Sequence, residues 1–279
     1  MFKFLNGKKN DPGKELRSLI GDFELPSFNA IVMDILQMLR DPDSSMKEIA
    51  GCVQIDPGTN VKVLRTVNSA AFGLASKVSN VLHAVSLLGR SRLELIVLAV
   101  AVRDSLPEMK SLFLDGTRFW TISSKRAMLA RELAELLHPS TKAESYTAAL
   151  LQDMAIPVIL CAKKEKYDRV LEKWYRDEES TLDRIEKDAF GYDHSAVGAL
   201  MAMEWDLPQH LVDSIAGHHN DDQESKAEPA VRLVSYLRYD DEGGLYTLKE
   251  NCVSAYNLNE ESLDHIIEKA FNKAEDLAL

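Results

Sequence analysis

One aspartate and three histidines are the residues of this chain best suited to bind a metal ion. Asp153 stands in an apolar stretch, residues 146–160, where a buried carboxylate must be hydrogen-bonded, paired with a cation or bound to a metal. His194, His218 and His219 follow close together on a predicted helical hairpin. Imidazole and carboxylate groups are ligands of divalent transition metals, and the helices of a bundle can bring them together. The residues therefore indicate a metal site or, alternatively, polar side chains satisfied at helix ends.

Helices are predicted to position all four residues. Residues 144–155 form an expected central helix that ends beside Asp153, and Asp193 is an expected cap for a helix over 194–204. A further helix over residues 208–218 ends at the two adjacent histidines. The sequence shows no sustained alternation of polar and apolar residues, which is the pattern of a strand. It therefore predicts an all-α protein, built as a multi-helix bundle.

Short sequence signals set helix boundaries in the first half of the chain. Ser45 and Glu48 are spaced as a capping box, and Asp56-Pro57 predicts another helix start. Gly89 is expected to end one short helix just before the next begins.

The chain of 279 residues is long enough for one large domain or two ordinary ones. Residues 107–116 are the predicted hinge between two helical bodies. We expect an N-terminal arm over residues 1–20, an N-terminal helical subdomain over 21–115, and a second helical subdomain over 116–279 that carries the histidines and ends in an amphipathic helix.

The net charge of −11 argues against general nucleic-acid binding, which requires a basic surface. Residues 56–103 are nevertheless basic, because they contain more lysine and arginine than aspartate and glutamate. One interpretation is a solvated helix surface, and the other is a patch for an anionic partner. The candidate partner-binding residues in this region are Arg65, Asn68, Ser69, Arg90 and Arg92. For Asn68 and Ser69, hydrogen bonds that hold the following turn are the alternative.

The cysteines and the apolar runs indicate a cytoplasmic protein without a membrane span. Cys52, Cys161 and Cys252 are widely spaced and form no CxxC motif, so neither a disulfide framework nor a zinc knuckle is expected. The longest apolar run, residues 93–102, is too short to cross a bilayer. The first residues also lack the apolar core of a signal peptide.

Several short motifs, in order along the chain, together resemble the HDOD domain. The resemblance covers about residues 25–239 and implies a bacterial cytoplasmic protein of the HD-like superfamily. Active members of that superfamily are metal-dependent phosphohydrolases and cyclic-dinucleotide phosphodiesterases, whereas HDOD proteins are mostly regarded as signalling or regulatory modules. The motifs that carry the resemblance are Leu25-Pro26, Asp41-Pro42, residues 55–57 (IDP), 67–73 (VNSAAFG), 84–89 (AVSLLG), Phe119-Trp120, 148–153, 193–198, 205–208 and His218-His219.

The resemblance also implies that three of the superfamily's metal ligands, and a lysine that often accompanies them, are missing. Its first histidine would fall at residues 121–123, which are Thr-Ile-Ser, and its His-Asp pair is Gln152-Asp153 in this chain. The lysine that often follows that pair is replaced by Ile156, and residues 234–236, Val-Ser-Tyr, stand where the last aspartate is expected. Phosphoester hydrolysis by such a site needs metal-generated hydroxide and a polarised phosphoryl group. We therefore assign no catalytic residue.

These observations favour a non-catalytic signalling or regulatory module of the HDOD family that binds a partner signalling protein or a small ligand. Gln152, Asp153, His194, His218 and His219 line the expected residual pocket, for which a nucleotide or cyclic dinucleotide is one candidate ligand. No cofactor is expected, but one residual divalent metal on the aspartate and the three histidines is left open. The alternative function is a divalent-metal-dependent phosphohydrolase or phosphodiesterase acting on a nucleotide or cyclic dinucleotide.

Overall fold

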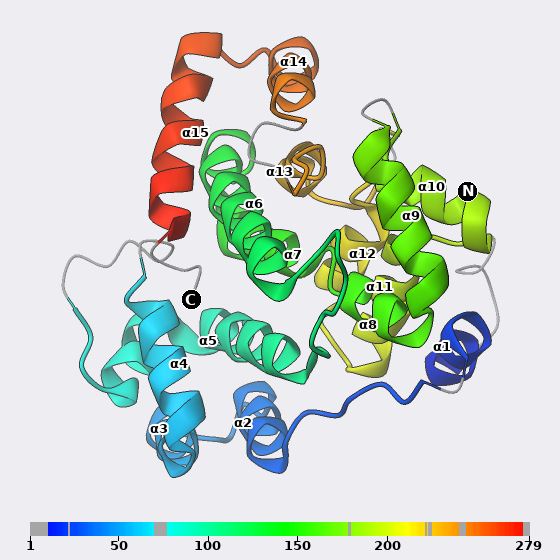
Figure 1. Cartoon of the computed structure of the whole chain (residues 1–279). Helices are drawn as coiled ribbons and strands as arrows, with labels where there is room; N and C mark the ends of the chain where they lie inside the picture. The colour runs from blue at the N-terminus through cyan, green and yellow to red at the C-terminus, as the bar shows by residue number, and fades with distance from the viewer. Residues whose placement is uncertain are drawn as a thin grey trace.

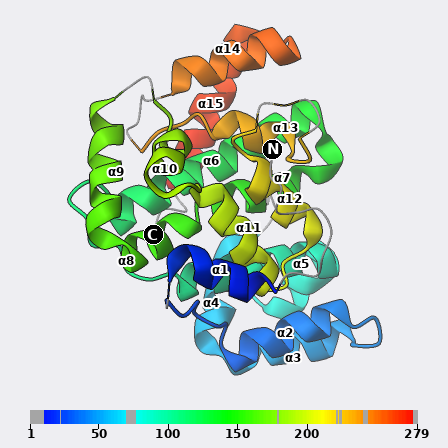
Figure 2. The ribbon, with the colours of Figure 1, turned by 90° about the vertical axis from the view of Figure 1, so that its right-hand side faces the viewer.

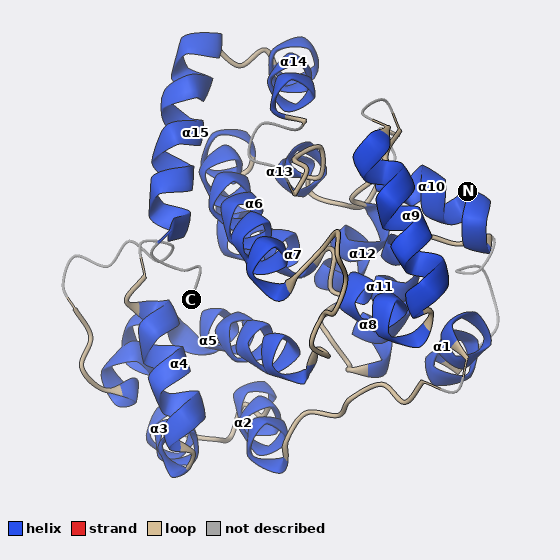
Figure 3. Ribbon diagram, viewed as in Figure 1, coloured by secondary structure: helices blue, strands red, loops and turns tan. Residues whose placement is uncertain are grey.

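The structure is a computed structural model, and it describes residues 11–21, 23–69, 77–177, 180–220, 222, 225–239 and 244–275. Within these ranges the regular elements are helices (Figure 3), together with one isolated bridge between Lys110 and Asp115. The predicted all-α fold is therefore confirmed.

Four helices form an N-terminal body, which lies at the bottom of both views in Figures 1 and 2. The long helix of this body packs against the other three. Its φ of 74° at Gly89 divides it into two helical pieces, as the position of that glycine predicts. The four helices are α2 (Ala30–Arg40), α3 (Met46–Ile55), α4 (Pro57–Val67) and α5 (Val81–Ser105).

The helix starts in this body follow the predicted caps. The hydroxyl of Ser45 accepts a hydrogen bond from the Glu48 amide at 3.2 Å, and the Glu48 carboxylate accepts one from the Ser45 amide at 2.7 Å. Asp56 caps α4, and Pro57 occupies its first position. Each cap satisfies amide groups that lack a partner at a helix N-terminus.

The remaining helices after residue 115 form a C-terminal body. Its central element, α6, packs against α7, α13 and α15 (Figure 1). The helices of this body are α6 (Gly116–Leu137), α7 (Lys142–Leu151), α8 (Ala155–Ala162), α9 (Lys164–Arg176), α10 (Leu182–Phe190), α11 (His194–Glu204), α12 (Gln209–Gly217), α13 (Pro229–Val234), α14 (Leu245–Tyr256) and α15 (Glu260–Glu275), with a short 3₁₀ helix η1 (Pro139–Thr141).

The described part of the predicted N-terminal arm is a docked helix. Residues Pro12–Ile20 form α1, which packs on α11 of the C-terminal body (Figure 2). Leu16 and Ile20 are buried, and the Tyr192 hydroxyl donates a hydrogen bond to the carbonyl of Leu19 at 2.8 Å. Residues 1–10 of the expected arm lie outside the described residues.

The two bodies are joined by polar and aromatic contacts. Arg40 of α2 forms an ion pair with Asp206, in the turn after α11, at 2.5 Å. The indole of Trp205 donates to the carbonyl of Pro26 at 2.8 Å and stacks on Phe28 at 5.1 Å between ring centroids. A single apolar core runs through both bodies.

One segment, Pro139–Ala162, is long and apolar enough to cross a membrane by length and composition. Of its apolar part, 83% is buried inside the protein, as in the core helix of a globular domain.

Candidate metal centre

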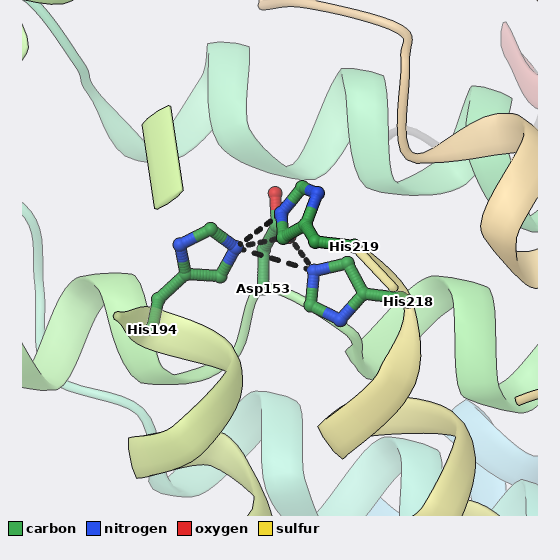
Figure 4. Close-up of side chains that lie close together, drawn as sticks. All are labelled: Asp153, His194, His218 and His219. Atoms are coloured by element: carbon green, nitrogen blue, oxygen red, sulfur yellow. Dashed lines mark hydrogen bonds and ion pairs between the residues drawn. The ribbon is translucent and has the colours of Figure 1, made fainter. Parts of the chain in front are cut away.

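Asp153, His194, His218 and His219 meet in the C-terminal body (Figure 4). One oxygen or nitrogen atom from each lies within 4.8 Å of the corresponding atoms of the others. Asp153, His194 and His218 are buried, and His219 is half-buried. The structure thus brings together the four residues that the sequence indicated as metal ligands.

Helix boundaries and one glycine explain how the four residues meet. Asp153 lies in the turn between α7 and α8, His194 begins α11, and the other two histidines directly follow α12. Gly198 permits the close approach of α11 to α12, because a Cβ atom at this position would lie 2.9 Å from Cγ2 of Ile215. The predicted Asp193 cap is also present, and its carboxylate accepts from the Ala196 amide at 2.8 Å.

Hydrogen bonds fix the orientation of two imidazoles. Nδ1 of His194 is 2.6 Å from the carboxylate of Glu186, and Nδ1 of His218 is 2.7 Å from the carbonyl of Ile215. Both partners are acceptors, so each Nδ1 carries a proton, and in the neutral imidazole the lone pair is on Nε2. Metal-binding histidines are oriented in this way by a carboxylate or carbonyl on the opposite ring nitrogen.

The inward-facing atoms of the four residues converge on one another. Nε2 of His194 is 3.2 Å from Nε2 of His218 and 3.0 Å from Nε2 of His219. The Oδ1 atom of Asp153 is buried without a hydrogen-bond partner among these residues, at 3.4 Å and 3.5 Å from Nε2 of His194 and His218. Three nitrogens and one oxygen are a donor set for a divalent transition metal. The residues present therefore fit such an ion.

The protonation states follow from the neighbouring charges. Burial alone would lower the pKa of His194, but the carboxylates of Glu186 and Asp153 hold it well above its usual range. Burial, together with the other two imidazoles, lowers the pKa of His219 well below its usual range. His219 is therefore neutral and available as a ligand at neutral pH, whereas a metal must displace a proton from His194.

The second oxygen of Asp153 has cationic and neutral partners. Arg126 of α6 donates from Nη1 to Oδ2, and the hydroxyl of Tyr239 donates to the same oxygen at 2.7 Å. Arg126 also donates from Nη2 to the carbonyl of Leu237. Burial alone would raise the pKa of Asp153, but the charge of Arg126 holds it well below its usual range. Asp153 is therefore a carboxylate with one oxygen directed toward the imidazoles.

A cavity of about 270 Å³ opens onto this centre. Asp153, His194 and His219 line it on one side, and Arg184 lines it from α10 as an exposed side chain. Gln152, expected in the same pocket, is buried outside the cavity lining, and its amide has no hydrogen-bond partner among the described residues.

The candidate partner-binding residues of the N-terminal body lie in different environments. Asn68 exchanges hydrogen bonds with the Val78 backbone at 2.7 and 2.8 Å, and Ser69 donates to the Thr66 carbonyl at 2.6 Å, so both have the local bonding role given as the alternative. Arg90 donates to carbonyls of residues 38–44 at the end of α2. The side chains left exposed on the surface are Arg65 and Arg92.

Three residues of the centre were not identified from the sequence: Arg126, Glu186 and Tyr239. Arg126 is one of several basic residues in α6, and Glu186 is one of several acids in α10, so neither stands out in the sequence. The sequence did indicate that a buried Asp153 could require a cationic partner. It could not show which arginine supplies that charge.

Family comparison identifies the domain. Residues 25–221 match the HDOD domain, and the chain belongs to this family. A curated relative from Treponema pallidum (strain Nichols), described as an uncharacterized protein, is 24% identical over 202 residues, or 71% of this chain. The matched region is 38% of that relative's length.

Solved structures with similar folds cover nearly the whole chain. A protein from Shewanella amazonensis SB2B, provisionally named a phosphohydrolase, has a TM-score of 0.72 and 21% identity and covers 94% of this chain and 97% of its own. An HDOD domain protein of unknown function from Geobacter sulfurreducens has a TM-score of 0.67 and 22% identity, with coverages of 95% and 96%. A protein from Marinobacter aquaeolei VT8, provisionally named for signal transduction, has a TM-score of 0.71 and 18% identity, with coverages of 96% and 65%. At these identities, the likeness shows the fold alone.

Proposed function

We propose that this HDOD protein is a regulatory module whose C-terminal body holds one divalent transition-metal ion on Asp153, His194, His218 and His219. The observation that carries the proposal is the orientation of His194 and His218, whose Nδ1 atoms are fixed by acceptors while their Nε2 atoms converge near Oδ1 of Asp153. Such an ion would join the turn after α7 to the start of α11 and the end of α12. Its occupancy would therefore stabilise one arrangement of these helices.

A single ion is favoured over a pair because Asp153 has one oxygen available. Its Oδ2 atom accepts from Arg126 and Tyr239 and cannot also bridge a second metal. Ile122, in the segment where the superfamily has its first histidine, is a buried apolar residue. These features support a non-catalytic role. We also propose that the protein is bacterial and cytoplasmic and that it binds a partner signalling protein.

A metal-dependent phosphohydrolase is the second candidate, and the cavity beside the centre is the observation that favours it. Three candidate ligands line this cavity, and the exposed Arg184 has no ion pair with another described residue. A bound metal would supply a Lewis acid and lower the pKa of a water ligand. A guanidinium group such as that of Arg184 is suited to hold a phosphate.

Metal content and turnover separate the two functions. Protein purified without chelator is analysed by inductively coupled plasma mass spectrometry and assayed with a nucleotide and a cyclic dinucleotide. His218→Ala is the test variant, and His210→Ala, an exposed residue of α12, is the control. The proposal expects one ion per chain, lost only in H218A, and no turnover. Two ions with turnover that disappears in H218A would establish the enzyme, and protein that cannot be loaded with any divalent metal would exclude both candidates.

A further inference from the structure

A second cavity, of about 300 Å³, lies between the two bodies on the other side of α6 from the metal centre. Helices α4 and α5 line it from the N-terminal body, and α6 and α7 line it from the C-terminal body. Ser124 faces this cavity, whereas Arg126, two positions along α6, lines the metal-centre cavity. Positions two apart on a helix point in nearly opposite directions, so α6 separates the two sites.

Positive side chains gather at this second cavity. Lys62, Arg65 and Arg103 line it, with Asp104 as the acidic residue among the lining side chains. Lys62 pairs with Asp104 at 2.5 Å, whereas Arg65 is exposed and has no hydrogen bond or ion pair with another described residue. Lys77 and Arg92 of the same basic segment are exposed but do not line the cavity. Arg65 is therefore the free cation at this cavity among its described lining residues.

Arg103 is placed close to another positive charge. Its guanidinium lies 5.0 Å from the ring centroid of Trp120, and the side chain is half-buried. Burial lowers the pKa of Arg103, and the nearby charge of Arg65 lowers it further, although Asp104 acts in the opposite direction. The repulsion between two positive charges in a partly buried site is relieved when an anion binds between them.

The rest of the lining is mostly apolar or aromatic, apart from the hydroxyl groups of Thr66 and Ser124. Ala99 and Val100 come from α5, and Tyr146 and Leu150 come from α7. Burial raises the pKa of Tyr146 to about 12, so its phenol is neutral and adds no negative charge to the cavity. The cavity therefore combines cationic and apolar lining residues. This combination suits a molecule with an anionic group and a less polar body.

We propose that the cavity between the two bodies binds a small phosphate monoester of nucleotide size, with its phosphate on Arg65, Lys62 and Arg103. Three cations against one carboxylate leave an excess charge that matches a phosphate dianion, and arginine binds phosphate through paired hydrogen bonds. A volume of about 300 Å³ is at the lower end of ligand sites, so one nucleotide fits better than a dinucleotide. This site is separate from the metal centre and does not depend on it.

Direct binding measurements test this assignment. Adenosine monophosphate is titrated into the full chain by calorimetry and by tryptophan fluorescence, for which Trp120 beside Arg103 is a built-in reporter. Adenosine, inorganic phosphate and citrate are titrated as comparison ligands. The expected result is saturable binding of the monophosphate, weaker binding of the nucleoside and of citrate, and loss of affinity as salt rises.

Arg65→Gln and Arg92→Gln form a matched pair, because both arginines are exposed residues of the same basic segment and only Arg65 lines the cavity. Arg65→Gln should weaken monophosphate binding by about tenfold or more. Arg92→Gln and His218→Ala should leave the dissociation constant unchanged, the second of these because the metal centre is a different site. Equal effects of the two arginine substitutions, tighter binding of citrate than of the monophosphate, or no saturable binding of any probe would overturn the assignment.

Discussion

Asp153 and Arg126 form an ion pair inside the C-terminal body, where their side chains are only 4% and 5% exposed. This pair neutralises a carboxylate that would otherwise be costly to bury. The two oxygens of Asp153 therefore have different partners. Oδ2 accepts hydrogen bonds from Arg126 and Tyr239, whereas Oδ1 is directed toward His194 and His218. Arg126 thus stabilises the buried carboxylate of Asp153 and leaves only its Oδ1 atom available to the proposed single metal ion.

Removing the cation should destabilise the fold strongly. Arg126→Met leaves the Asp153 carboxylate buried without its charged partner, and we expect a loss of about 3 kcal/mol or more in the free energy of unfolding. Urea denaturation at neutral pH measures this loss. The double variant Arg126→Met/Asp153→Leu should recover part of it, because no charge is then left unpaired. An R126M variant as stable as the exposed-site control Arg92→Met would contradict this role for the pair.

Glu186 should tune metal affinity without binding the metal. Its carboxylate is 2.6 Å from Nδ1 of His194 and also accepts a hydrogen bond from the Tyr167 hydroxyl. Glu186→Gln is expected to weaken binding by about 10- to 100-fold, as for other groups that orient a ligand histidine. Competition with a chromophoric chelator measures the dissociation constant, and His210→Ala is the control. Unchanged affinity in E186Q would mean that the carboxylate does not orient His194 for a metal.

The close packing of α11 on α12 should be disturbed by any larger side chain in place of Gly198. Gly198→Ala places a methyl group 2.9 Å from Cγ2 of Ile215, and we expect it to cost about 1–3 kcal/mol of stability. Gly51→Ala in α3 is the matched control, because a Cβ atom at that position meets nothing within 4 Å. G51A should be neutral or stabilising by up to about 1 kcal/mol, since alanine favours a helix over glycine. Thermal or urea unfolding compares the two, and equal effects would refute the proposed close contact.

Acid should loosen the attachment of α15 to α6. Glu132 on α6 pairs with Lys273 at 2.8 Å and Lys269 at 3.2 Å. Burial alone would raise the pKa of Glu132, but the two lysines outweigh it and lower the pKa. The stabilisation is therefore fully present above the unfolded-state pKa of about 4.3 and is lost as pH falls through the lower folded-state value.

The pH dependence can be measured with Glu132→Gln. At pH 7 this variant should be less stable than the wild type by about 1 kcal/mol. The difference should shrink toward zero below about pH 4, where the wild-type carboxylate becomes protonated. Urea unfolding across this range gives the difference directly. A constant gap between wild type and E132Q from neutral to acidic pH would rule out the ionic contribution.

Features set by neighbouring residues could be predicted from the sequence. The caps at Ser45, Asp56 and Asp193 and the break at Gly89 are present, because each depends on residues within one helical turn. The buried position of Asp153 was also foreseeable, since its flanking sequence is apolar almost throughout.

Features set by tertiary packing could not be predicted in the same way. Arg126 and Glu186 are single charged residues on helices, and only the approach of other elements makes them partners of Asp153 and His194. The hydrogen bonds from the guanidinium of Arg90 to backbone carbonyls after α2 likewise depend on the packing of α5 against α2. The docking of α1 onto α11 likewise joins segments far apart in the sequence.

Anomalous X-ray diffraction from crystals grown with Mn²⁺ or Ni²⁺ tests the metal centre most directly. We predict one anomalous peak per chain, within about 2.0–2.2 Å of Nε2 of His194, His218 and His219 and of Oδ1 of Asp153. Arg126 should still bind Oδ2 in the same crystals. Crystals of the intact protein with no peak at these four atoms, or with two peaks bridged by Asp153, would contradict a single-metal regulatory centre.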